Sequence, residues 1–112
     1  MIVNTLSSKK IMVQRLEQLA ELYRQDQASE LMEYTLSKLF QYEADMSRQQ
    51  LRRLSEDLSG YEQHYGMSSH EFYDLYQRGN DDRMDYVEWA SLFQMAQRVK
   101  KHLSLLTGEN TL

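Results

Sequence analysis

Aromatic rings gather in the second half of the sequence, and they are the side chains best suited to binding another protein. Eight of the twelve aromatic residues lie between Tyr61 and Phe93. A chain of 112 residues cannot easily enclose so many rings in its own core, and tyrosine and tryptophan favour protein interfaces. We therefore expect this segment to recognise a partner. The candidate partner-binding residues are Tyr61, Tyr65, Phe72, Tyr73, Tyr76, Trp89 and Phe93.

The same rings could instead pack the last two helices of the chain against each other. We favour this packing role for Phe72, Trp89 and Phe93, and both roles stay open for the tyrosines. Nearby carboxylates could meet the basic surface of a partner and steer its association. These acidic residues are Asp74, Asp81, Asp82, Asp85 and Glu88.

Metal and catalytic chemistry are not expected. His64 and His70 are six residues apart, which is not a metal-ligand spacing. The acidic run from Asp81 to Glu88 lacks the alternation and the central glycine of a calcium loop. The sequence has no cysteine, no phosphate-binding glycine loop and no Ser/His/Asp arrangement. We predict a protein that is not an enzyme, with no cofactor and no metal.

Long helices must position these residues, because the sequence has no proline and no glycine before Gly60. A 3.6-residue period predicts a first helix over about residues 9–24, a break at residues 25–27, and a second helix from about Ala28. The apolar positions are Ile11, Met12, Leu16, Leu19, Ala20 and Tyr23 in the first helix, and Leu31, Met32, Thr35, Leu36, Leu39 and Phe40 in the second.

The second helix is predicted to be long, because a heptad seam follows over residues 51–65. Gly66 predicts its end. Ser68 and Glu71 form a capping box that predicts a short helix ending at Gly79.

The last helix is expected to start with Asp85 as its cap and to run to about Leu106. No apolar run approaches the ~20 residues of a membrane span, and no signal peptide opens the chain. We therefore expect no membrane contact and a cytoplasmic location.

Residues 2–6, Ile-Val-Asn-Thr-Leu, are the only plausible β-strand. Together with Arg-Leu-Glu-Gln-Leu-Ala at 15–20 and Ser-Glu-Leu at 29–31, they make the first 45 residues resemble the ribbon-helix-helix fold of small repressors (the Arc, MetJ and CopG group). The resemblance implies a homodimer whose two-stranded ribbon enters the major groove of operator DNA. Residues 1–25 carry a net charge of +2 within a chain of net charge −4.

The ribbon-helix-helix fold, if formed, predicts which residues contact DNA. Val3, Thr5 and Ser7 would face outward as base readers, and Asn4 would read bases instead if the strand register shifts by one. Lys9 and Lys10 would meet phosphates, and backbone amides at Ser29 could hold another phosphate.

A second resemblance covers about residues 36–106. Tyr-Glu-Gln-His-Tyr-Gly-Met-Ser-Ser-His-Glu-Phe-Tyr at 61–73, and Met-Asp-Tyr-Val-Glu-Trp at 84–89 after Asp81 and Asp82, resemble the antitoxins of prokaryotic type II toxin–antitoxin pairs. The resemblance implies that the chain neutralises a cognate toxin, expected to be an RNase.

The predicted fold class is mainly α, with a short N-terminal strand, a ribbon-helix-helix dimer, a long helix and two shorter C-terminal helices. The predicted domains are a ribbon-helix-helix dimerisation and DNA-binding module (1–45), a long helical connector that continues the second helix (46–66) and a helical toxin-binding segment (67–112). The predicted function is an antitoxin that dimerises, represses its operator and binds a toxin. The alternatives are a structural coiled-coil or adaptor dimer without DNA binding, and a repressor without a protein partner.

Overall fold

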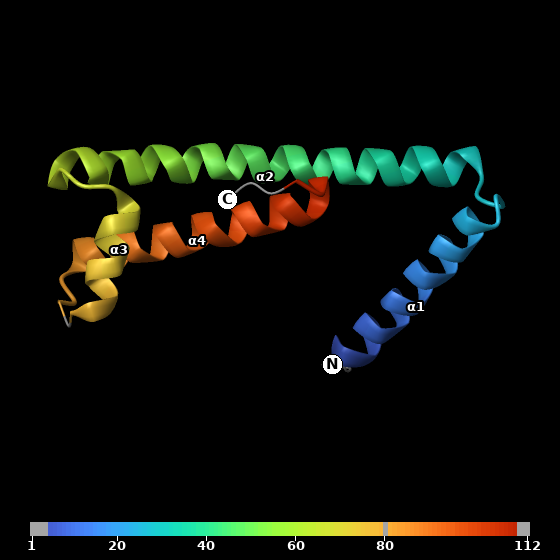
Figure 1. The fold of residues 1–112 in the computed structure, drawn as a ribbon, viewed down its shortest axis with the longest axis horizontal. Helices are drawn as coiled ribbons and strands as arrows, with labels where there is room; N and C mark the ends of the chain where they lie inside the picture. Colours follow the sequence, from blue (N-terminus) through green and yellow to red (C-terminus); the bar gives the residue numbers. More distant parts are fainter. Residues whose placement is uncertain (1–4, 80, 110–112) are drawn as a thin grey trace. The chain divides into compact units, whose positions relative to one another are not determined.

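The computed structural model describes residues 5–79 and 81–109 of the chain. Every element in those residues is an α-helix, and they contain no β-strand. The chain divides into two units, Met1–Lys38 and Leu39–Leu112. The helices are α1 (Thr5–Arg24), α2 (Glu30–Tyr65), α3 (Ser69–Arg78) and α4 (Met84–Thr107) (Figure 1).

The predicted N-terminal strand is wrong where the structure describes it. Thr5 and Leu6 lie in the first turn of α1, and residues 2–4 lie outside the described residues. A helix satisfies its backbone within one chain, whereas a five-residue strand needs a partner strand. Residues 5–8 contain no proline or glycine that would end a helix. α1 therefore extends past the start predicted at about residue 9 and begins at Thr5. The ribbon-helix-helix fold class is therefore corrected to an all-helical one over the described residues.

α1 ends in a left-handed turn made by a residue other than glycine. Asp26 has a φ of 56°. The Gln27 amide donates to the Leu22 carbonyl (2.8 Å), and the Asp26 amide donates to the Tyr23 carbonyl (3.1 Å). This pair of bonds is the Schellman motif, with an aspartate where glycine is usual. It explains how the helix stops at the polar run predicted as a break.

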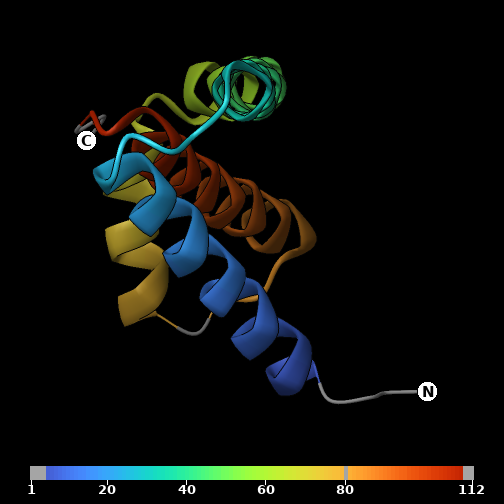
Figure 2. The same cartoon turned by 90° about the vertical axis from the view of Figure 1, so that its right-hand side faces the viewer.

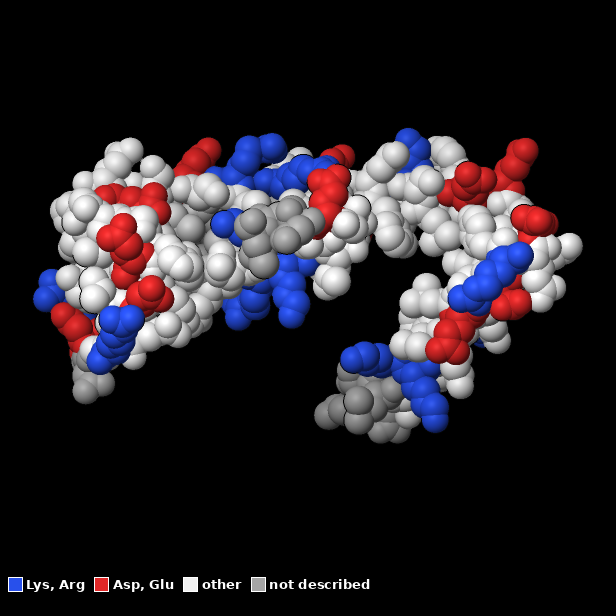
Figure 3. Space-filling model, in the orientation of Figure 1, with Lys and Arg blue, Asp and Glu red and all other residues white. Residues whose placement is uncertain are grey.

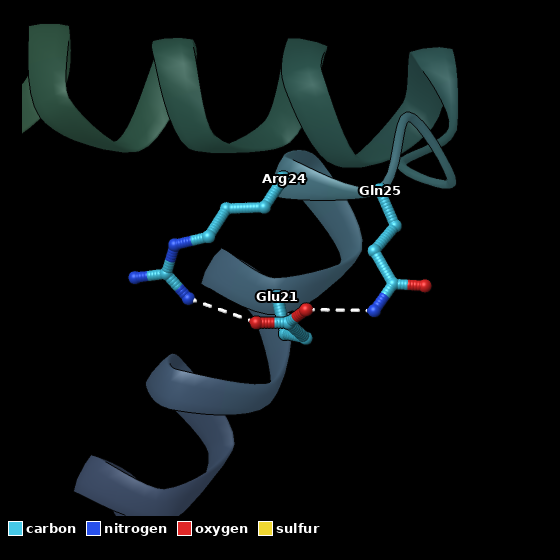
Figure 4. A network of polar contacts seen from close by, with 3 residues as sticks. All are labelled: Glu21, Arg24 and Gln25. Atoms are coloured by element: carbon cyan, nitrogen blue, oxygen red, sulfur yellow. Dashed lines mark hydrogen bonds and ion pairs between the residues drawn. The ribbon is translucent and has the colours of Figure 1, made fainter.

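The last turn of α1 also carries a small polar network (Figure 4). The Glu21 carboxylate accepts hydrogen bonds from the Gln25 amide (2.7 Å) and the Arg24 guanidinium (3.1 Å). Both bonds favour the charged carboxylate and lower the pKa of Glu21. All three side chains are exposed, so the network contributes little to stability.

α2 is a single helix of 36 residues, about 54 Å long. Ser29 caps its start, because the Ser29 hydroxyl accepts from the Met32 amide (3.2 Å). Its end is the glycine predicted from the sequence: Gly66 has a φ of 69°, and its amide donates to the Glu62 carbonyl (2.8 Å). The predicted long helix is confirmed.

α3 begins with the predicted Ser68 cap. The Ser68 hydroxyl accepts from the Glu71 amide (3.1 Å), and the Glu71 carboxylate accepts from the same hydroxyl (3.3 Å) instead of from the Ser68 amide. A contact from α2 adds to this cap, because the Glu62 carboxylate accepts from the Ser69 amide (2.8 Å). The helix stops at Gly79, as expected.

α4 begins one residue before its expected cap. Arg83 occupies the cap position and makes no side-chain capping bond, so the prediction that Asp85 caps this helix is wrong. Asp85 instead lies in the first turn and accepts a hydrogen bond from Tyr65. The helix continues to Thr107, where the left-handed Gly108 ends it.

Within residues 39–112 the three helices share one apolar core. α4 runs back beside α2, and α3 lies at the end where α2 stops (Figure 1). The view turned by 90° shows α3 and α4 on the same side of α2 (Figure 2). The buried members of the core are Leu54, Leu58, Phe72, Trp89, Ala90, Ala96 and Val99.

The predicted boundary at residue 45 falls inside α2, which runs without interruption. The predicted connector over residues 46–66 corresponds to the second half of that helix. None of the described helices is both long enough and apolar enough to cross a membrane.

Candidate protein-binding surfaces

Trp89 lies at the centre of the aromatic cluster. Its side chain is 0% exposed. It stacks on Phe72 with ring centroids 3.8 Å apart, and on Tyr61 and Tyr65 with centroids 5.5 Å apart in each case. Stacking of this kind adds to the stabilisation from burial. Because the indole is enclosed by the chain's own side chains, it acts in packing and not as a surface that a partner can reach.

The polar atom of this buried indole has a partner. The Trp89 Nε1–H donates to the Ser69 hydroxyl at 2.9 Å, and Ser69 is itself buried. Leaving a buried N–H without a partner costs the desolvation of that group, which exceeds the net contribution of an ordinary hydrogen bond to stability. Ser69 therefore fixes the depth at which the ring sits between α3 and α4.

Replacing Ser69 by alanine should leave the indole N–H unsatisfied. We expect Ser69→Ala to lower the free energy of unfolding by about 1–3 kcal/mol in urea denaturation followed by circular dichroism. Ser91→Ala is the matched control, because Ser91 is exposed on α4. Equal effects of the two substitutions would contradict the role given to Ser69.

Two tyrosine hydroxyls join the end of α2 to the start of α4. Tyr61 donates to the Glu88 carboxylate (2.6 Å), and Tyr65 donates to the Asp85 carboxylate (2.9 Å). The bond to Glu88, together with partial burial, raises the pKa of Tyr61 to about 12. The bond to Asp85 raises the pKa of Tyr65 for the same reason.

The raised pKa of Tyr61 predicts a loss of stability in alkali. An unfolded tyrosine releases its proton near pH 10, whereas Tyr61 in the folded chain holds it to about pH 12. The contribution of Tyr61 is therefore complete below pH 10 and is lost as the pH rises from 10 to about 12. The difference in tyrosinate absorbance between the native chain and Tyr61→Phe measures this pKa. Glu88→Gln should move it back toward 10, and an unchanged value would contradict the assignment.

The structure brings the other predicted partner-binding residues into the same cluster. Phe72 is buried, whereas Tyr73, Tyr76 and Phe93 are half-buried. Tyr73 lies 4.9 Å from Phe93 between ring centroids, and its hydroxyl accepts from the Gln94 amide. The outer edges of the tyrosines remain accessible beside the packed rings.

Sequence reasoning missed Tyr86 as a member of this cluster. Its ring contacts Tyr65 and Phe72 edge-on at 5.6 and 5.4 Å, and the Arg83 guanidinium lies over it at 4.5 Å. Tyr86 lies three residues before Trp89, and that spacing on one helix was the available signal.

Acidic side chains gather around α3 and the start of α4 (Figure 3). Asp74, Asp81, Asp82, Asp85 and Glu88 are all exposed. Only one ion pair among them is recorded in the described residues, between Asp81 and Arg83 (3.3 Å). No group of three or more histidines and carboxylates in the described part of the chain is placed to hold a metal.

The predicted DNA contacts that lie in the described residues are not on a strand. Val3 and Asn4 lie outside the described residues, and Thr5 lies in α1. Ser7, Lys9 and Lys10 are exposed on the same helix. Ser29 uses its hydroxyl to cap α2.

The apolar face of α1 is largely exposed. None of the residues from 7 to 38 is buried. Met12, Leu16, Leu19 and Tyr23 follow each other at spacings of four, three and four, which places them on one face. Met12 is 58% exposed and Leu16 is 55% exposed. The predicted homodimer was expected to cover this α1 face with a second copy of the chain.

The first half of α2 shows a second uncovered apolar strip. Leu31, Leu39 and Met46 lie within about 80° of one another around the helix axis and are exposed. The buried positions Ala44, Ser47, Leu54 and Leu58 lie on a different side of the same helix. α2 therefore presents one stripe to its own core and a second stripe to solvent.

No family model, curated protein or solved structure matches the chain. Function is therefore inferred from the chain's own residues and their geometry. The two features that a function must explain are the self-contained aromatic core and the uncovered α1 face.

Proposed function

We propose that the protein is a homodimeric protein-binding module that acts as the antitoxin of a toxin–antitoxin pair. The observation that carries the dimer is the α1 face, an apolar stripe in a unit whose residues 7–38 include no buried one. Monomeric proteins rarely leave such stripes in water, because covering them is favourable. The aromatic rings of the second unit, by contrast, cover one another.

A second copy of the chain is large enough to cover this face. Exposed large apolar residues lie on or beside the α1 face and at the start of α2. They offer roughly 550 Å² per chain, close to what the smaller stable interfaces bury from each partner. A patch paired with its own copy gives a closed two-fold dimer. The residues that contribute are Met12, Val13, Leu16, Tyr23, Leu31 and Met32.

The antitoxin role rests on the sequence resemblance and on the chemistry of the second unit. Residues 61–89 carry the resemblance, and their rings and carboxylates lie on α2, α3 and α4. An excess of exposed carboxylates suits a toxin whose basic surface binds RNA. Binding of such a toxin would block its access to RNA.

DNA binding is not part of the proposal. The base-reading roles of Val3, Thr5 and Ser7 depended on a two-stranded ribbon, and Thr5 lies in a helix. If the dimer binds no toxin, the function would be that of the alternative, a structural adaptor.

Two measurements test the proposal. Sedimentation equilibrium of the full chain should give a dimer at micromolar concentration, and a monomer at all concentrations would overturn it. Co-expression with the product of the adjacent gene should yield a stable complex and restore growth where that product alone is toxic. If the two proteins stay separate and growth is not restored, the antitoxin role is wrong.

A further inference from the structure

The outward face of α4 carries an apolar stripe that takes no part in the core. Met84, Val87 and Met95 lie on the side of α4 opposite Trp89 and Ala96, with Ser91 between them. Met84 is 77% exposed, more than any other large apolar residue in the described part of the chain. Methionine is a side chain that adapts its shape to a binding partner.

Carboxylates surround the first turns of this stripe. Asp81 and Asp82 precede Met84, and Asp85 and Glu88 follow it, whereas Arg83 is the one basic residue among them. The hydrogen bonds from Tyr65 and Tyr61 hold Asp85 and Glu88 in place and leave both residues exposed. Asp82 makes no hydrogen bond or ion pair recorded in the described residues.

We propose that this α4 stripe, Met84, Val87, Ser91 and Met95, binds a basic amphipathic helix of a partner protein. The four positions follow at spacings of three, four and four, with three apolar side chains and the small Ser91 between them, which matches the ridge of another helix. The flanking carboxylates match lysine or arginine beside that ridge. The inference rests on the proposed function, because it names the surface that takes the toxin. It also places the toxin contact on the outward side of α4 instead of on the packed aromatic rings.

The test uses the full chain and a synthetic peptide of about 14 residues, made of leucine and lysine with the leucines on one helical face. Titration followed by backbone amide NMR should move the signals of residues 82–95 and give a dissociation constant. The affinity should fall several-fold between about 50 mM and 300 mM salt. A peptide with glutamate in place of lysine should not bind. Absence of binding by the lysine peptide, or equal binding by both peptides, would overturn the inference.

Matched variants identify the stripe. The double substitution Met84→Ser and Val87→Ser should weaken peptide binding about tenfold. Leu105→Ser is the control, because Leu105 is 74% exposed near the other end of the same helix. Asp82→Asn should weaken binding more than Asp57→Asn, which alters an exposed carboxylate on α2. Equal effects of the variants and their controls would overturn the inference.

Sedimentation separates this inference from the proposed dimer. The double variant should remain as associated as the native chain, and its thermal unfolding by circular dichroism should be unchanged. Weaker self-association of the double variant would assign the stripe to a second copy and overturn the inference. A monomeric chain that still binds the peptide at residues 82–95 would support the inference while the proposed dimer fails.

Discussion

Trp89→Ala should lower the free energy of unfolding of residues 39–112 by about 3–5 kcal/mol. The substitution removes the ring on which Phe72, Tyr61 and Tyr65 stack and leaves a cavity between the helices. Since domains of this size are stable by only about 5–15 kcal/mol, the variant should be close to unfolding. Urea denaturation followed by far-ultraviolet circular dichroism gives the value.

A control and a graded variant make this prediction specific. Tyr34→Ala removes an aromatic ring that is 63% exposed, so we expect a change within about 0.5 kcal/mol. Trp89→Phe keeps a ring in the cluster and should cost less than Trp89→Ala. A similar small effect for all three would contradict the central place of Trp89. If Trp89→Ala abolishes toxin capture, the cause is expected to be loss of the fold.

Leu16→Asp should convert the dimer to monomer, with a dissociation constant at least ~100-fold higher. In a two-fold dimer the substitution places two unpaired charges within the apolar interface, one from each chain. Sedimentation equilibrium over a range of concentrations measures the change. The helix content should stay the same, because Leu16 is exposed in the single chain and makes no buried contact there.

Gln14→Asp is the matched control for the dimer. It introduces the same charge into the same helix, on the side away from Leu16. We expect the Gln14→Asp protein to remain dimeric. If both variants dissociate, charge alone is responsible, and if neither does, the α1 face is not the interface.

Signals that act within four residues were predicted well from the sequence. Gly66 and Gly79 end their helices where expected, and Ser68 caps α3 through the Glu71 amide. These features depend on backbone conformation and on a side chain one turn away. The heptad spacing likewise predicted the long helix, because a period can be read without knowing the neighbouring helix.

Features that depend on distant residues were not predicted. Tyr61 bonds to Glu88 across 27 positions, and Trp89 bonds to Ser69 across 20 positions. Asp85 was predicted to cap α4 because Glu88 follows it by three residues, the spacing of a capping box. In the fold, the Asp85 carboxylate accepts from the Tyr65 hydroxyl instead. The strand failed for a related reason: five residues with weak β-preference do not decide between helix and strand.

The candidate site was predicted in composition, and the burial of two of its rings was expected. All seven selected aromatic residues lie in one cluster, and Phe72 and Trp89 are buried in it, as the packing role favoured for them predicts. Whether a ring faces a core or a partner depends on how the helices pack, and the spacing of apolar residues along one helix does not predict that packing. The uncovered α1 face shows the converse, since its residues have the same spacing as a core stripe.

The enclosed indole gives this protein a natural fluorophore. It is the only tryptophan in the chain, and its neighbours all come from residues 51–99. Its emission should shift to longer wavelength when water reaches the ring, so the spectrum reports the unfolding of one unit without any label. The amino-terminal helix contains no tryptophan, and events there can be followed separately with an added dye.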